Sequence, residues 1–125
     1  MTTDADIVTA RQRGRSLAVE MGFSSGNATL IATAISELAR NMLLYAGSGE
    51  IQLERVRGQE RAGLEVVARD QGPGIPDLQQ ALLDGYSTAR RLGLGLPGVK
   101  RLMDEFSIQT APGTGTTVVV RKWSR

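Results

Sequence analysis

One turn combines an acid, two glycines and a proline in a spacing that could present a hydrogen-bond acceptor to a ligand. A strand-like run over 64–68 leads to Asp70, and Gly72 and Gly74 then enclose a proline. Glycine permits close approaches, whereas proline fixes its own φ and restricts the residue before it, so we expect a stiff turn. Such a turn would hold the Asp70 carboxylate in place. The same residues also form ordinary turns that bind nothing.

A second glycine-rich segment could bind phosphate. Gly93, Gly95 and Gly98 stand immediately before an expected helix, and a helix start offers unpaired N–H groups and the positive end of the dipole. Three cations flank the segment: Arg90, Arg91 and Lys100. The alternative is a glycine-rich helix cap without a ligand. The spacing fits neither a Walker A loop, which needs Gly-Lys-Ser/Thr, nor a Rossmann fingerprint, which follows the first strand directly.

Glu37 and Asn41 lie four residues apart, so a helix would stack them on one side, at the edge of its apolar stripe. The amide oxygen of an Asn could complete the shell of a phosphate-bound Mg²⁺, which keeps few protein ligands. A neighbouring Glu could orient and deprotonate an attacking hydroxyl or water. In isolation, such a pair is more often a solvated polar pair on an amphipathic helix.

Composition narrows the chemistry that these residues could perform. The 125 residues, 41% of them hydrophobic, suit one globular domain spanning 1–125. There is no cysteine and no histidine, so carboxylates must carry any proton transfer. A net charge of +2, with two Phe, two Tyr and one Trp, makes nucleic acid a weak candidate partner. No apolar run reaches membrane-spanning length and the N-terminus does not resemble a signal peptide, so we expect a cytoplasmic protein without a membrane partner.

Two amphipathic helices are expected in the first part of the chain. The first covers about 6–21, opened by Asp4 or Asp6 and stopped by Gly22. A linker at 23–27 separates it from the second and stronger helix, at about 28–45, which carries Glu37, Arg40 and Asn41 and ends at Gly47. Arg40 is expected to point further towards solvent. The apolar stripe of this helix consists of Ile31, Ala34, Ile35, Leu38, Met42 and Tyr45.

The rest of the chain alternates between strands and turns. Segments 50–56 and 63–69 read as an antiparallel hairpin. A short helix at 77–83, capped by Asp77, and a mobile polar segment at 84–92 are expected next. A third helix follows Gly98 and extends to Asp104. Strands at 107–110 and 116–123 then enclose a hairpin turn with Gly113, Gly115 and Thr116, which by itself predicts no ligand.

Taken in this order, the motifs resemble the GHKL ATPase/kinase superfamily, which includes the ATP-binding domains of gyrase, Hsp90, histidine kinases and MutL. Within it, the chain is similar to the small RsbT-like anti-sigma serine/threonine kinases. Three segments carry the resemblance: Ala-Ile-Ser-Glu-Leu-Ala-Arg-Asn at 34–41, Asp-Gln-Gly-Pro-Gly-Ile-Pro at 70–76, and the run from Gly93 to Ile108 that contains Leu-Pro-Gly-Val-Lys-Arg-Leu-Met-Asp. The resemblance covers nearly the whole chain.

The resemblance implies a two-layer α/β (α+β) sandwich of the Bergerat type. A mixed, mostly antiparallel sheet would be covered on one face by three main helices, with ATP held between helices and sheet. Asp70 would accept a hydrogen bond from the adenine amino group, with Gly72 and Gly74 giving the base and sugar room. Asn41 would ligate Mg²⁺ and Glu37 would be the catalytic base. The nucleotide would also contact Gly93, Leu94, Gly95, Leu96, Gly98 and Lys100 around the phosphates and Thr116 near the adenine.

The resemblance also implies a Mg²⁺-ATP-dependent protein serine/threonine kinase in a partner-switching stress-response module. Its substrate would be a STAS-domain antagonist of the RsbS type, often with a stressosome scaffold of the RsbR type. Phosphorylation would free the kinase to activate a PP2C phosphatase of the RsbU type. RsbT-like chains usually carry an extended stretch before the first helix, whereas few residues precede Ile7 here, so we expect an edge strand to be shortened or absent.

Two other classes of protein stay open. The chain could be an anti-sigma factor that sequesters a sigma subunit while also acting as a kinase. It could also be a non-catalytic module that uses nucleotide as a structural switch, although Glu37 argues against this class. The small size and the absence of histidine argue against a histidine kinase, which needs a separate phosphoacceptor domain.

Overall fold

The computed structural model describes residues 3–72, 95–111 and 113–124. The expected short helix at 77–83 and the segment at 84–92 lie outside this part of the chain. The first helix, α1, covers Asp4–Glu20. Its cap is Thr3 and not an aspartate as predicted, because Thr3 and Asp6 form a reciprocal capping box in which each side chain accepts the backbone N–H of the other.

Helix α2 covers Ser25–Ala46 and begins three residues earlier than the apolar stripe suggests. The hydroxyl of Ser24 accepts the N–H of Asn27 and caps the helix, so most of the segment predicted as a linker forms its first turn. The predicted end is confirmed, since Gly47 adopts the left-handed conformation with φ 78° and its N–H bonds to the carbonyl of Leu43.

The sheet contains β1 (Glu50–Arg57), β2 (Ala62–Asp70), β3 (Glu105–Ala111) and β4 (Gly115–Trp123), in the spatial order β1-β2-β4-β3. Every neighbouring pair among these described strands is antiparallel. The predicted hairpin of β1 and β2 is confirmed. In the central pair, the last residue of β2 lies opposite Thr116, near the start of β4, so residues far apart in sequence meet at this end of the sheet.

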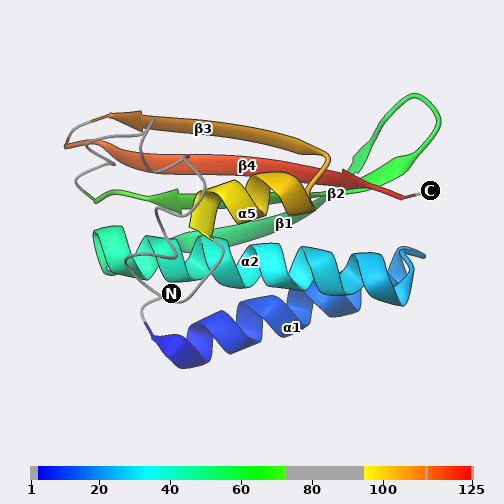
Figure 1. Ribbon diagram of the computed structural model, residues 1–125, viewed down its shortest axis with the longest axis horizontal. Helices are drawn as coiled ribbons and strands as arrows, with labels where there is room; N and C mark the ends of the chain where they lie inside the picture. Colours follow the sequence, from blue (N-terminus) through cyan, green and yellow to red (C-terminus); the bar gives the residue numbers. More distant parts are fainter. Residues whose placement is uncertain (1–2, 73–94, 112, 125) are drawn as a thin grey trace.

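The helices lie on one face of the sheet (Figure 1). Helix α2 runs along the sheet, α1 packs against α2, and α5 (Gly95–Leu102) lies over the sheet beside α2. The predicted two-layer arrangement with three main helices is therefore confirmed.

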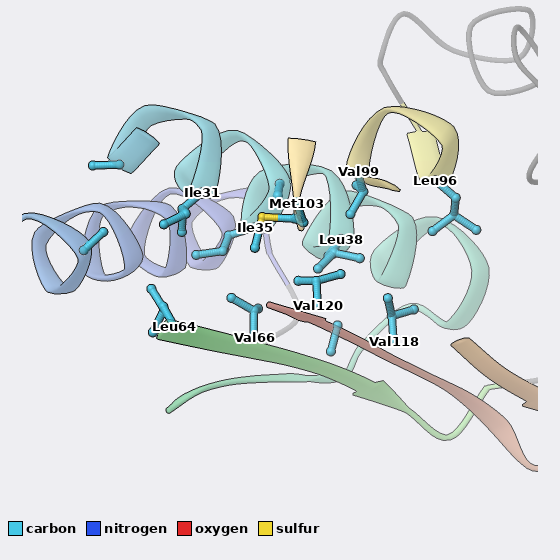
Figure 2. Packing of buried hydrophobic residues seen from close by; sticks show 14 of the residues in the cluster. Ile31, Ile35, Leu38, Leu64, Val66, Leu96, Val99, Met103, Val118 and Val120 are labelled. Carbon is cyan, nitrogen blue, oxygen red and sulfur yellow. The ribbon is translucent and has the colours of Figure 1, made fainter. Parts of the chain in front are cut away.

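The core forms between α2, α5 and the two central strands (Figure 2). Successive turns of α2 place apolar side chains towards the alternate residues of β2 and β4 that point at the helices. The labelled residues of this contact are Ile31, Ile35, Leu38, Leu64, Val66, Val118 and Val120. Burial of each of these aliphatic side chains stabilises the folded state by about 1.5–3 kcal/mol. This packing fixes α2 on the sheet and thereby positions the polar side chains at the edge of the stripe.

Helix α5 begins at Gly95, so Gly95 and Gly98 belong to the helix, whereas all three glycines of this segment were predicted to precede it. The helix is anchored at its far end by Lys122 of β4, which is only 7% exposed and whose Nζ donates to the Leu102 carbonyl at 2.8 Å. Val99 and Met103 pack into the core. These contacts hold α5 beside α2.

Candidate functional site

A small pocket opens between α2 and the adjoining ends of β2 and β4. It brings together Asn41, Asp70 and Thr116, three polar residues predicted to contact a nucleotide from separate parts of the sequence. Apolar side chains complete its lining: Leu38, Met42, Tyr45, Ala68 and Val118. A pocket with apolar walls and a few convergent polar groups is the usual form of a small-molecule site.

The Asp70 carboxylate holds the turn that carries it. Its Oδ1 accepts the backbone N–H of Gly72 at 2.9 Å and the backbone N–H of Thr116 at 3.2 Å. The second bond joins residues 46 positions apart and ties the end of β2 to the start of β4. Because hydrogen bonds to a carboxylate are stronger than neutral ones, they fix the plane of the carboxylate at the pocket.

Two glycines let backbone segments converge at Asp70. Gly115 has φ +101°, and a Cβ on it would lie against the carbonyl oxygen of Asp70. A Cβ on Gly72 would lie against Ala46, the last residue of α2. Any side chain at either position would therefore push the turn away from β4 or from α2. The described part of this turn, residues 70–72, is therefore packed between α2 and β4; its proline lies outside the described residues.

Thr116 is 8% exposed and its hydroxyl lies 2.9 Å from the hydroxyl of Thr110. Thr110 was not predicted as part of the site. The register of the last hairpin could have revealed it, because the turn at 111–115 places Thr110 directly opposite Thr116. The apolar lining residues were predicted only as core, since a helical stripe does not show where the core ends and a pocket begins.

Asn41 is 8% exposed, and its Nδ2 is a buried polar atom without a hydrogen-bond partner in the described part of the chain. Leaving a buried polar group unpaired costs about 1–3 kcal/mol, so a bound ligand that completes this amide would offset the cost. Rotating the amide by half a turn would present its oxygen instead, as Mg²⁺ requires. The described residues contain no cluster of three metal-binding side chains. An ion held mainly by phosphate oxygens and by one amide oxygen needs no such cluster.

Glu37 lies one turn before Asn41 on α2 and is also buried, with 7% of its side chain exposed. Its Oε1 lies 2.9 Å from Nη1 of Arg40, an ion pair that the sequence analysis did not predict although the spacing i, i+3 allows it. Glu37 and Arg40 also line an open groove of about 300 Å³ between α1 and α2, together with Val8 and Arg11. The two predicted residues of α2 therefore border two different hollows.

The residues predicted to bind phosphate fall partly on α5. Gly95 and Gly98 lie in its first turns, and Leu96, with 3% of its surface exposed, belongs to the hydrophobic core. Lys100 is exposed in the last turn of the helix. The remaining members of this set lie outside the described residues: Arg90, Arg91, Gly93 and Leu94. Gly74, predicted to give the base and sugar room, lies outside them as well. The phosphate cradle accordingly stays a prediction.

Comparison with known proteins agrees with the family resemblance of the sequence motifs. The sequence profile of the histidine kinase-, DNA gyrase B- and HSP90-like ATPases matches residues 26–124. The serine/threonine-protein kinase RsbT of Bacillus subtilis (strain 168) is 54% identical over 123 residues, which are 98% of this chain and 92% of that protein. The anti-sigma F factor of Caldanaerobacter subterraneus subsp. tengcongensis is 30% identical over 99 residues, which are 74% of this chain and 68% of that protein.

Among solved structures, full-length ShkA in complex with AMPPNP is similar, with a TM-score of 0.58 and 18% sequence identity. The likeness covers 99% of this chain and 31% of that chain, and at this identity it shows the fold alone. None of the helices in the described residues combines the length and the apolar character needed to cross a membrane.

Proposed function

Because the chain belongs to the family of histidine kinase-, DNA gyrase B- and HSP90-like ATPases, we propose that its pocket binds Mg²⁺-ATP and that Glu37 activates a serine or threonine hydroxyl of a partner protein. The chain is a serine/threonine-protein kinase related to RsbT. The observation that carries the proposal is the meeting of Asp70 with the unpaired amide of Asn41 in one pocket, with Glu37 one helical turn away.

In this proposal the nucleotide lies with its base at Asp70 and its phosphates towards α5. The carboxylate of Asp70 accepts the adenine amino group, and Thr116 lies beside the base. Asn41 would hold Mg²⁺, and the ion would neutralise charge on the phosphate oxygens. The backbone amides of Gly93, Gly95 and Gly98 would surround the phosphates, because N–H groups at a helix start favour anions. The roles of Gly74, Leu94, Leu96 and Lys100 follow from the family resemblance.

Glu37 would act on the acceptor. Its carboxylate takes the proton of the serine or threonine hydroxyl as the hydroxyl oxygen bonds to the γ-phosphorus; the bond from that phosphorus to the bridging oxygen breaks, and ADP leaves. An acceptor side chain would reach Glu37 from the groove between α1 and α2, which Glu37 lines. Positioned proton transfer of this kind contributes about 10²–10⁴-fold to a rate.

The partners follow from the relationship to RsbT, which supports a partner-switching module. We propose a cytoplasmic STAS-domain protein of the RsbS type as substrate, together with an RsbR-like scaffold. Release of the phosphorylated substrate would leave the kinase to bind and activate an RsbU-like PP2C phosphatase.

A second candidate is an anti-sigma kinase that binds a sigma subunit directly. The similarity to anti-sigma F factors, at 30% identity, favours it. A pull-down with the sigma subunits and the PP2C phosphatases of the same organism separates the two candidates, because only an anti-sigma factor retains a sigma subunit.

The central experiment is incubation of the native chain and of Glu37→Ala with labelled ATP, Mg²⁺ and the STAS-domain proteins of the same organism. We expect the native chain to label one of them and Glu37→Ala to lower the rate by about 10²–10⁴-fold, while calorimetry shows ATP binding unchanged. Transfer by Glu37→Ala at the native rate would remove Glu37 as the base. Binding of ATP by the native chain without any transfer would support the non-catalytic class.

A further inference from the structure

The ion pair on α2 gives the proposed base a fixed orientation. We infer that Arg40 is a positioning residue that holds the Glu37 carboxylate for proton transfer; the inference rests on the proposed role of Glu37 as the base. Arg40 would touch neither nucleotide nor acceptor in this role. It would act through Glu37 alone.

The two side chains differ in their surroundings. The side chain of Glu37 is 7% exposed, whereas that of Arg40 is 47% exposed, so the guanidinium reaches inward from the surface to the carboxylate. Nη1 of Arg40 lies 2.9 Å from Oε1 of Glu37, within hydrogen-bonding distance. A buried carboxylate requires hydrogen-bond partners or a counter-ion, and Arg40, three residues further along the same helix, is one such partner and carries the opposite charge.

The contact also constrains geometry. The last torsion of a Glu side chain has a broad, nearly two-fold profile, so an unrestrained carboxylate samples many orientations. A guanidinium presents its N–H groups in a rigid, planar array. The contact between Nη1 and Oε1 therefore narrows the rotation of the carboxylate and favours one direction of its second oxygen along the groove. Because a base must lie within hydrogen-bonding reach of the proton that it removes, a loosely oriented carboxylate would slow transfer without weakening binding.

Arg40 could instead contact the acceptor protein, since it lines the same groove as Glu37. The two roles differ in what a substitution changes. A positioning residue affects kcat and depends on Glu37, whereas a docking residue affects KM for the acceptor and works independently of Glu37.

The test is a double-mutant cycle. Arg40→Ala and Arg40→Lys are made in the native chain and in Glu37→Gln, and phosphorylation of a STAS-domain protein from the same organism is followed with labelled ATP and Mg²⁺. In the native background we expect Arg40→Ala to lower kcat about tenfold, with KM for ATP and for the acceptor unchanged. Arg40→Lys keeps the charge but loses the planar array, so its kcat should lie in between. In Glu37→Gln we expect Arg40→Ala to change nothing further.

Arg13→Ala serves as the matched control, because Arg13 is an exposed arginine on α1 outside both hollows; it should leave kcat unchanged. Thermal unfolding and ATP calorimetry establish that the Arg40 variants fold and bind nucleotide. A native kcat for Arg40→Ala, an equal loss in both backgrounds, or a raised KM for the acceptor at unchanged kcat would each overturn the inference while leaving Glu37 as the base. A native rate for Glu37→Gln would instead remove the proposed base itself.

Discussion

The carboxylate of Asp70 has a structural role that is distinct from the recognition role proposed for it. Both backbone N–H groups, from Gly72 and from Thr116, donate to the same oxygen, Oδ1. The second oxygen, Oδ2, is the one that could accept a hydrogen bond from adenine in the pocket. This division suggests a substitution that keeps the structural role and changes only the recognition role.

We predict that Asp70→Asn folds but binds ATP more weakly. The amide oxygen of Asn would take the place of Oδ1, because the two N–H donors require an acceptor there. Its NH₂ group would then face the adenine amino group, donor against donor. Leaving such a pair unsatisfied costs about 1–3 kcal/mol, which corresponds to a loss of affinity of about 5-fold to 150-fold. Isothermal titration calorimetry measures this loss.

Glu54→Gln is the control for this prediction, since Glu54 is an exposed acid on β1 away from the pocket. It removes the same charge and should leave the affinity for ATP unchanged. If Asp70→Asn bound ATP as tightly as the native chain, Asp70 would not be the residue that reads the adenine.

Lys122 shows how the elements of the site depend on contacts away from it. This lysine is 7% exposed; its Nζ donates to the Leu102 carbonyl at the end of α5 and lies 3.9 Å from Oδ1 of Asp104. The bond satisfies a carbonyl that the helix itself leaves unpaired. Since α5 begins at the glycines proposed to bind phosphate, the anchor at its far end helps to set their position.

We predict that Lys122→Met lowers the free energy of unfolding by about 1–3 kcal/mol, because methionine keeps most of the apolar stem but leaves the Leu102 carbonyl and Asp104 without the ammonium group. Urea unfolding followed by circular dichroism measures the change. Lys100→Met, on the exposed side of the same helix, should alter the free energy of unfolding by less than about 0.5 kcal/mol. Equal losses in both variants would show that Lys122 does not anchor α5.

The helices and strands were predictable where apolar residues repeat at a regular spacing or where a capping residue marks an end. The stripe of α2, the hairpin of β1 and β2 and the end of α2 at Gly47 all follow from local rules. The start of α2 was missed because Ser24 caps a turn that lies outside the apolar stripe. The cap of α1 was missed because Thr3 and Asp6 act as a pair, and neither residue alone indicates this.

The site was predictable only in part from local patterns, because its contacts join distant segments. Turn chemistry identified Asp70, but its bond to the Thr116 backbone depends on the pairing of β2 with β4. The partnership of Arg40 with Glu37 depends on a side-chain conformation that spacing permits without requiring. The family resemblance predicted that these separate motifs meet at one site, because it implied that all of them contact the same nucleotide.

The proposed role of Asn41 would link the stability of the folded chain to ligand binding. In the described residues its buried Nδ2 has no hydrogen-bond partner, and Asn41 lines the pocket. A protein tolerates the cost of an unpaired buried group where function requires the group. Binding of Mg²⁺-ATP should then stabilise the folded state through mass action and through completion of this amide.

We predict that Mg²⁺-ATP at about a hundred times its Kd raises the Tm of the native chain by about 10 °C, since this concentration corresponds to about 2.7 kcal/mol. ATP with EDTA should give a smaller increase, because the phosphates then lack the ion. In Asn41→Ala the two increases should be equal, as the proposed protein ligand of Mg²⁺ is gone, while the Tm without nucleotide changes little because the unpaired amide is removed with the side chain. A persistent difference between ATP with Mg²⁺ and ATP with EDTA in Asn41→Ala, measured by differential scanning calorimetry, would show that Mg²⁺ is held without Asn41.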